Sequence, residues 1–182
     1  MQTFNIGKYK VVLKEHDNNK TDNSMYENVI DFGCEDNKTI VVQVLCGTES
    51  RNVAFLVPFY TPVEHFAVPS DNKIFMMFND ILCVFNPETC KIEQEKELET
   101  MGTMFLAFAY EKDFILYGEV EIYRVDKNLN VLWEFSGKDV FVKKSGVEPA
   151  FQMKDDRICL YDFSDNYYEI DYEGNILMEI QL

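Results

Sequence analysis

The feature that most constrains this fold is a pattern that occurs three times along the sequence. Each copy has a polar pair, a short apolar run, a polar break, a second apolar run that ends before Asn or Asp, and a third run after a turn. The first runs begin at Ile74, Phe114 and Ile158. The second runs end at Asn86, Asp126 and Asp171, which are 40 and 45 positions apart. This spacing predicts small repeated structural units rather than separate domains.

A further apolar run precedes each copy. Counting back eight and seven positions from the opening hydrophobe gives Phe66-Ala67, Leu106-Ala107 and Ala150-Phe151. Short apolar runs between turn residues are typical of strands, so each unit is predicted to contain four. One stretch, Met101 to Phe108, has apolar residues at helical spacing. It contains Gly102 and aligns with the strands of the other copies, so we expect a strand there as well.

Residues 63–182 resemble β-propeller repeats, especially PQQ-like and WD40-like blades, in which a hydrophobe-Asp-x-x-Gly turn joins the last two strands. The last copy carries the full turn, Ile170-Asp171-Tyr172-Glu173-Gly174. Leu129 stands in the glycine position of the middle copy, and the first copy is one residue longer. The resemblance implies an all-β protein of four-stranded antiparallel blades at residues 63–98, 103–137 and 147–182. It implies no activity, because one fold hosts many functions.

The first 60 residues match this pattern less closely. They contain apolar stretches at 9–13, 29–32, 39–45 and 53–59, and Asp36 to Ile40 resembles Ser70 to Ile74. Two interpretations are open. The segment is either a divergent first blade, which would give a closed ring of four, or a separate sheet that caps an array of three. We expect the first arrangement, within a single all-β domain over residues 1–182.

The segment around Asp171 admits a calcium-binding loop or a tight turn. A calcium loop needs several more oxygen ligands at fixed spacing, and Asn86 and Asp126 lack them in the equivalent copies. In a turn, Asp171 accepts backbone hydrogen bonds and Gly174 adopts a positive φ. We therefore expect a turn, and no metal or other cofactor.

The charge of the chain restricts its partners. The 182 residues include 32 acidic and 17 basic side chains, which give a formal charge of -15. Such a chain repels phosphate and anionic lipid, so neither nucleic acid nor a membrane surface is an expected partner. A partner selected by charge would be a basic protein. The alternative is that the acidity only maintains solubility.

The cysteines predict a reducing environment. They are odd in number and form no Cys-x-x-Cys pair: Cys34, Cys46, Cys83, Cys90 and Cys159. Scattered thiols with apolar neighbours are typical of small buried side chains in the cytoplasm. The N-terminus lacks a basic segment followed by an apolar one, and no apolar stretch approaches the roughly 20 residues of a membrane span. A cytoplasmic location is expected.

The clearest candidate for partner binding is the acidic stretch that follows the first turn. Its carboxylates alternate with other residues at Glu93, Glu95, Glu97 and Glu99. On a strand, alternate side chains share a face, so all four are predicted to point one way along an outer edge. Charge on an edge strand also prevents pairing with other chains, which is the simpler explanation. Trp133 is predicted to pack between blades or, if exposed, to anchor a partner.

Two candidate enzymatic sites are weaker. His65 aligns with Phe105 and Pro149, so we expect a packed strand residue rather than a catalytic base. Tyrosines and acids occur together at 161–163 and 167–169, as in some carbohydrate-binding clefts. A glycosidase also needs two carboxyl groups at a defined separation, which sequence does not reveal.

Taken together, the sequence favours a non-enzymatic protein-interaction module with an acidic surface. An intracellular inhibitor or immunity-type protein for a basic partner would have this size and charge. The alternative is a small propeller domain that binds or hydrolyses carbohydrate.

Overall fold

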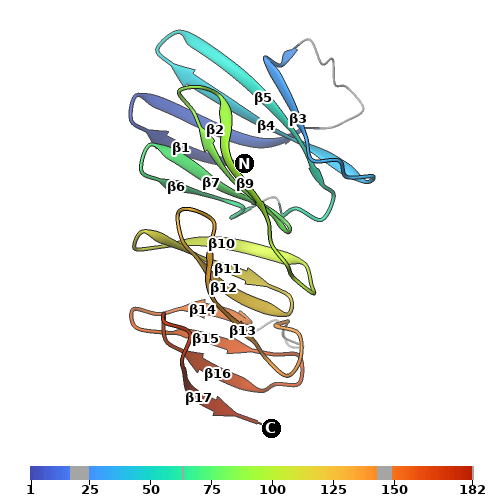
Figure 1. Ribbon diagram of the computed structural model, residues 1–182, viewed down its shortest axis with the longest axis vertical. Coiled ribbons are helices and arrows are strands. Elements are labelled where there is room, and N and C mark those ends of the chain that lie inside the picture. Colours follow the sequence, from blue (N-terminus) through green and yellow to red (C-terminus); the bar gives the residue numbers. More distant parts are fainter. Residues whose placement is uncertain (17–24, 63, 143–148, 182) are drawn as a thin grey trace. The chain divides into compact units, whose positions relative to one another are not determined.

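The computed structural model describes residues 1–16, 25–62, 64–142 and 149–181 (Figure 1). It divides into two compact units, Met1–Leu98 and Glu99–Leu182, which are described separately. Within the described ranges, no helix is long and apolar enough to span a membrane. The regular elements are strands, grouped into one five-stranded and three four-stranded sheets.

The first unit begins with the five-stranded sheet. Its strands are β1 (Gln2–Ile6), β2 (Tyr9–His16), β3 (Asn28–Asp31), β4 (Asn37–Cys46) and β5 (Glu49–Pro58). Their order across the sheet is β1-β2-β4-β5-β3, and β3 runs parallel to β5 while the other pairs are antiparallel. The second sheet of this unit is an antiparallel meander of β6 (Ala67–Ser70), β7 (Lys73–Phe78), β8 (Ile81–Asn86) and β9 (Lys91–Glu97).

The second unit contains two further meanders of four strands. The first consists of β10 (Met104–Tyr110), β11 (Asp113–Gly118), β12 (Glu121–Val125) and β13 (Val131–Ser136). The second consists of β14 (Phe151–Met153), β15 (Ile158–Tyr161), β16 (Tyr167–Ile170) and β17 (Ile176–Ile180). In each meander, consecutive strands are neighbours, so the last strand lies at an edge.

The predicted fold class is confirmed. All three repeats form four-stranded antiparallel sheets, and the Met101 to Phe108 stretch becomes β10, which begins at Met104. The starts predicted at residues 63 and 147 lie outside the described residues. The N-terminal prediction missed β1, because the strand has three polar residues, Gln2, Thr3 and Asn5, and only Phe4 and Ile6 as apolar residues that contact the core.

Each unit is stabilised by the packing of its two sheets. In the first unit, Ile40 and Phe55 of the five-stranded sheet share a core with Met76 and Phe78, and the Phe55 and Phe78 rings are 5.6 Å apart. In the second, two groups of buried residues meet: Ile115, Ile122 and Phe135 from one sheet, and Ile158, Leu160 and Ile170 from the other. Full burial of one such side chain contributes about 1.5–3 kcal/mol.

The segment at Asp171 is the predicted turn. Oδ1 of Asp171 accepts hydrogen bonds from the backbone N–H groups of Glu173 and Asn175, at 3.0 and 2.7 Å, and the Asn175 amide donates to Oδ2 at 2.9 Å. Asp126 makes the equivalent bonds with Asn128 and Asn130 in the preceding repeat. An Asp-x-x-x-Asn sequence therefore closes the last hairpin in both sheets of the second unit.

A third turn of this kind joins β15 to β16, where it is buried. Oδ1 of Asp162 accepts from the N–H groups of Ser164 and Asn166, both at 3.0 Å. Oδ2 accepts from the Asn166 amide at 2.8 Å and from the Tyr168 hydroxyl at 2.9 Å. A fully buried carboxylate is costly unless its oxygens are hydrogen-bonded, and these four donors meet that requirement.

The turns also place one residue at positive φ in the same position of each repeat. These residues are Cys90 at 54°, Leu129 at 64° and Gly174 at 86°. A Cβ on Gly174 would lie 2.8 Å from Cγ of Trp133. The glycine is therefore required both by its backbone conformation and by the indole packed against it.

The last strand of each meander has an irregularity after its first or second residue. In the register of the sheets, Phe85 faces Ile92 and Val84 faces Gln94, which leaves Glu93 without a partner. The same shift leaves Leu132 and Leu177 unpaired in the other repeats. An inserted residue reverses the alternation of side chains beyond it and increases the local twist.

Gly174→Ala is expected to destabilise the second unit by about 2–4 kcal/mol, because alanine is strained at positive φ and its methyl group displaces Trp133. Gly47→Ala provides the matched control. Gly47 has a φ of 60°, but no heavy atom lies within 4 Å of an added Cβ, so only the backbone cost of about 1 kcal/mol applies. Urea unfolding of both variants measures the difference. Equal losses would show that the Trp133 contact contributes nothing.

Acid is expected to weaken the Asp171 turn. The hydrogen bond from the Asn175 side chain, together with backbone N–H groups, lowers the pKa of Asp171 below its usual 3.8. A lowered folded-state pKa stabilises the protein above pH 3.8, and this stabilisation is lost as the pH falls through and below that value. Urea unfolding at about pH 6 and about pH 3 should therefore show a smaller acid loss for Asp171→Asn than for the natural chain. Asp155→Asn, which removes an exposed carboxylate, should leave that loss unchanged.

Candidate functional site

The predicted acidic strand lies at a sheet edge. β9 is the terminal strand of its sheet, and the side chains of Glu93, Glu95 and Glu97 are exposed along it. Glu99 follows the strand and is the first residue of the second unit. The edge position is thus confirmed for three of the four carboxylates.

The prediction that all four carboxylates face one way is wrong. Glu93 is the residue left unpaired by the shift in register, so the alternation changes beyond it. Glu95 and Glu97 are opposite Cys83 and Ile81, on the side that carries the core of the first unit. A strict two-residue alternation does not allow for an inserted residue, and nothing in the letters KIEQEKELE marks one.

Glu93 is already engaged within the protein. Its carboxylate contacts Nζ of Lys73 at 2.5 Å and accepts a hydrogen bond from the Asn86 amide at 2.6 Å. The Lys73 ammonium, followed by Asn86, lowers the pKa of Glu93. Glu95 and Glu97, by contrast, form no ion pair with any described residue. Within β9, the free charge of the stripe therefore resides on these two residues.

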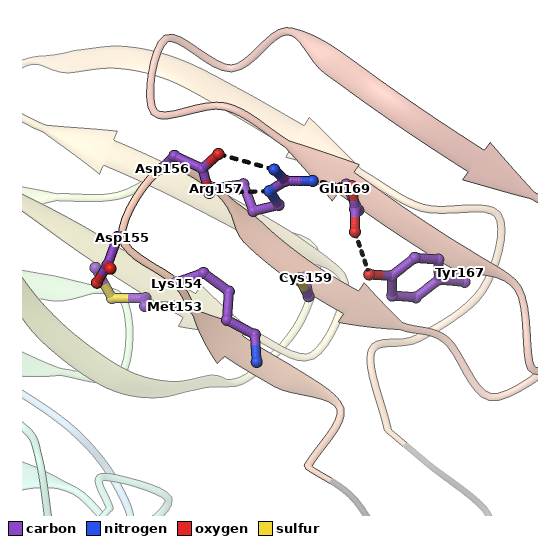
Figure 2. Close-up of a pocket in the computed structure, with 8 residues that line it drawn as sticks. All are labelled: Met153, Lys154, Asp155, Asp156, Arg157, Cys159, Tyr167 and Glu169. Atoms are coloured by element: carbon purple, nitrogen blue, oxygen red, sulfur yellow. Dashed lines mark hydrogen bonds and ion pairs between the residues drawn. The ribbon is translucent and has the colours of Figure 1, made fainter.

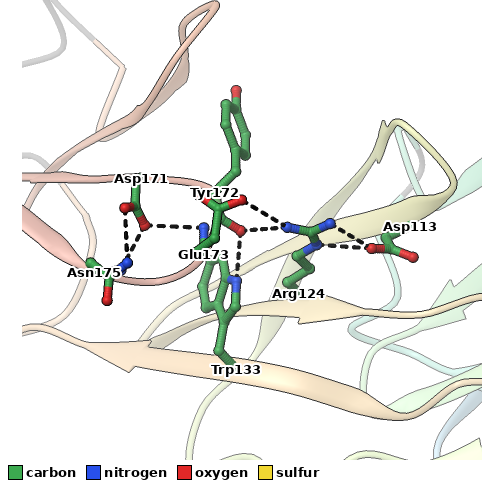
Figure 3. Close-up of polar contacts among 7 residues, drawn as sticks. All are labelled: Asp113, Arg124, Trp133, Asp171, Tyr172, Glu173 and Asn175. Atoms are coloured by element: carbon green, nitrogen blue, oxygen red, sulfur yellow. Dashed lines mark hydrogen bonds and ion pairs between the residues drawn. The ribbon is translucent and has the colours of Figure 1, made fainter.

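Trp133 packs on the turn of the neighbouring sheet, as Figure 3 shows. Its indole N–H donates to the carbonyl of Tyr172 at 2.8 Å, and the same carbonyl accepts from Arg124 at 2.7 Å. Arg124 also pairs with the buried Asp113 at 2.7 Å, and the Tyr110 ring stacks on Tyr172 with centroids 3.7 Å apart. Trp133 therefore lies between two sheets, as predicted. Its indole is half-buried, so only the exposed part of the ring can contact a partner.

His65 is not the packed strand residue that was predicted. It precedes β6, its side chain is exposed, and its φ is 56°. The neighbouring Phe66 is buried in the core instead. The alignment of the repeats is correct here, because Ala67 and Ala107 pair with the equivalent residues Met76 and Leu116. His65 is exposed because its left-handed conformation bends the chain just before the strand.

Of the predicted tyrosine and acid group, Tyr167 and Glu169 line a surface hollow of about 520 Å³ (Figure 2). Arg157 lines it and bonds Asp156 at 2.8 Å and Glu169 at 2.7 Å. The Tyr167 hydroxyl donates to the other oxygen of Glu169 at 2.6 Å. Asp162, a member of the predicted carbohydrate group, is fully buried in its turn and does not reach the hollow.

The charge state of this hollow does not suit general acid catalysis. A glycosidase acid needs a raised pKa so that it carries a proton near neutrality. Here the Tyr167 hydroxyl and Arg157 lower the pKa of Glu169, and Arg157 lowers that of Asp156. Both carboxyl groups are therefore ionised and paired. Among the described residues there is also no group of three or more His, Cys, Asp or Glu side chains suited to a metal ion.

The sequence did not predict the Arg157–Glu169 pair. Arg157 immediately precedes β15, and Glu169 faces Cys159 across the β15–β16 hairpin. Opposite charges at the two ends of a predicted hairpin were the available signal. No such signal exists for Lys73 and Glu93, because they lie on β7 and β9, which are separated by β8.

Comparison with known proteins identifies the fold. No protein-family model matches the sequence, and no curated protein matches it. Among solved structures, BamB from Moraxella catarrhalis has a TM-score of 0.52 at 12% identity, over 82% of this chain and 47% of BamB. Raptor from Chaetomium thermophilum has a TM-score of 0.53 at 10% identity, over 80% of this chain and 15% of Raptor.

BBS1N, in a complex with ARL6DN, has a TM-score of 0.51 at 11% identity, over 80% of this chain and 49% of BBS1N. All three are β-propeller proteins, and this chain spans about half the length of two of them. Identities this low show the fold alone. The chain is therefore an all-β, propeller-like array of small antiparallel sheets.

Proposed function

We propose that this chain is a non-enzymatic interaction module that binds a basic protein through the acidic edge of β9. The observation that carries the proposal is the pair Glu95 and Glu97, exposed on an unpaired edge strand and without an ion-pair partner among the described residues. Propeller folds commonly act as protein-interaction scaffolds. One partner of this kind would be a basic protein that the chain binds and inhibits, as an immunity protein does.

An edge strand can bind a partner through its backbone as well as its charges. The free N–H and C=O groups of β9 can pair with an extended segment, in the mode by which a peptide adds a strand to a sheet. Lysine or arginine on that segment would meet Glu95 and Glu97, while the rest of a chain with formal charge -15 repels anionic competitors. Charge thus favours a basic protein over nucleic acid or a membrane as the partner.

The thiols support a reducing, cytoplasmic setting for this function. All five cysteines are free, and Cys83, Cys90 and Cys159 are buried. Burial, with a smaller effect of the Glu95 charge, raises the pKa of Cys83, which keeps that thiol protonated and unreactive. These three buried cysteines therefore act as small core residues.

Carbohydrate chemistry is less well supported. The hollow has the aromatic and carboxylate lining that such a function needs, but Asp156 and Glu169 are tied to one arginine and have lowered pKa values. A sugar would have to displace a charge-assisted hydrogen bond, which is among the stronger bonds available to these groups.

A peptide of alternating lysine and valine residues tests the proposal. It should bind the natural chain, and the double variant Glu95→Gln, Glu97→Gln should bind it about three- to tenfold more weakly, since each exposed ion pair contributes roughly 0.2–1 kcal/mol. The affinity should also fall with increasing salt. Isothermal calorimetry at low and moderate ionic strength measures both effects.

The matched control is Glu35→Gln with Glu49→Gln, which changes the net charge equally at exposed sites of the same unit. If both double variants weaken binding equally, net charge rather than β9 selects the peptide. Unchanged affinity in the β9 variant would also contradict the proposal.

A further inference from the structure

The last sheet, β14 to β17, has a packed face and a second face that carries the hollow. Its packed face belongs to the core of the second unit and includes Leu160 and Ile170. The strand register places the alternate residues on the opposite side, which we call the outer face: Cys159, Tyr161, Tyr167, Glu169, Met178 and Ile180. Three of these residues, Cys159, Tyr167 and Glu169, line the hollow of Figure 2.

The preceding sheet shows that an equivalent face is covered by another sheet. On that face Phe135 is opposite Ile122, just as Ile180 is opposite Tyr167 on the outer face. Phe135 packs in the core that the two sheets share and is 9% exposed, whereas Ile180 is 45% exposed. The outer face thus corresponds to a sheet-packing surface, but none of the described residues forms a sheet over it.

An ion pair occurs at the same place on both faces, but with its charges exchanged. In the preceding sheet, Arg124 is opposite Trp133 and pairs with Asp113 at 2.7 Å. In the last sheet, Glu169 stands in the position of Arg124. It pairs at 2.7 Å with Arg157, which stands in the position of Asp113. The side chain of Asp113 is 4% exposed, whereas that of Arg157 is 36% exposed.

The covered pair shows what a covering sheet supplies. Arg124 donates at 2.7 Å to the carbonyl of Tyr172, in the last turn, and lies 3.8 Å from the Glu173 carboxylate (Figure 3). A cation on one sheet therefore meets an acceptor and an acidic side chain on the turn of the next. Glu169 reverses this requirement, because a carboxylate accepts hydrogen bonds and attracts cations. A turn that covers the outer face is expected to carry lysine or arginine in the position of Glu173.

We propose that the outer face is a docking surface for a β-sheet of a basic protein, whose turn places a lysine or arginine on Glu169. Three carboxylates and two basic side chains line the hollow on this face, so its charge also favours a cation. Met178 and Ile180 supply apolar area beside the ion pair. A second copy of this chain does not meet the requirement, because its last turn would bring Glu173 against Glu169. The proposal is independent of the β9 function, because β9 belongs to the first unit.

A hairpin peptide with the sequence of residues 167–180 tests the docking, because the turn of this segment already contacts the equivalent face. Its ends are joined covalently, which reduces the entropy cost of binding. With Glu173→Arg, the peptide should bind the full chain and shift the NMR signals of the backbone amides in β15, β16 and β17. The unmodified peptide should bind about three- to tenfold more weakly, because its glutamate meets Glu169.

Two matched controls separate position from net charge. A peptide with Glu179→Arg has the same net charge, but its arginine lies on the strand rather than in the turn, so it should bind about as weakly as the unmodified peptide. In the full chain, Glu169→Gln should weaken binding of the Glu173→Arg peptide about three- to tenfold. Glu134→Gln, at an exposed position of β13, should leave that binding unchanged.

Exchange of the ion pair gives the most direct test. Arg157→Asp combined with Glu169→Arg recreates the arrangement of Asp113 and Arg124 on the outer face. This variant should prefer the unmodified peptide to the Glu173→Arg peptide, and circular dichroism verifies its fold. The proposal is overturned if the natural chain does not bind the Glu173→Arg peptide at up to about 2 mM, a concentration that detects even weak binding. Shifts confined to residues outside the last sheet, or an unchanged preference in the folded exchange variant, would overturn it as well.

Discussion

The burial of one small sheet against another is the interaction on which this structure depends. A four-stranded meander has an apolar face that only a second layer of structure can bury. Paired sheets bury a shared core, as Phe55 and Phe78 do in the first unit and Phe135 and Tyr168 in the second. The sequence can therefore diverge widely between repeats while each repeat keeps apolar residues at the positions that face its neighbour.

This dependence explains why the sheets could be predicted from the sequence, while the directions in which several side chains point could not. Apolar runs, polar breaks and the Asp171 turn reflect local chemistry, so the strands of residues 67–180 were found within a few residues of their bounds. The facing of the acidic strand was missed because the inserted residue Glu93 is a property of the pairing with β8, not of β9 alone. The pairing of β3 was missed for the same reason, because its parallel partner β5 lies more than twenty positions further along the chain.

The buried Asp162 shows a related limit. Its sequence neighbours, Phe163 to Asn166, predict a polar break, and a polar break is normally exposed. The structure buries the carboxylate because four donors converge on it, including the hydroxyl of Tyr168 from the next strand. A tyrosine two positions after the Asn of such a turn is a usable signal, but only once the hairpin is known. His65 is the opposite case, because alignment with Phe105 and Pro149 predicted burial and the left-handed backbone conformation leaves its side chain exposed.

The two edge strands, β9 and β17, differ in the charged and apolar side chains that they expose. An exposed strand edge invites association with other chains, and proteins commonly protect such edges with charge. β9 carries three glutamates, whereas β17 carries Glu179 alone, which pairs with Lys138 at 3.2 Å. Its other side chains, Ile176, Leu177, Met178 and Ile180, are 45–54% exposed. Charge therefore protects the β9 edge from pairing with other chains, whereas β17 exposes apolar side chains and one glutamate that is already paired.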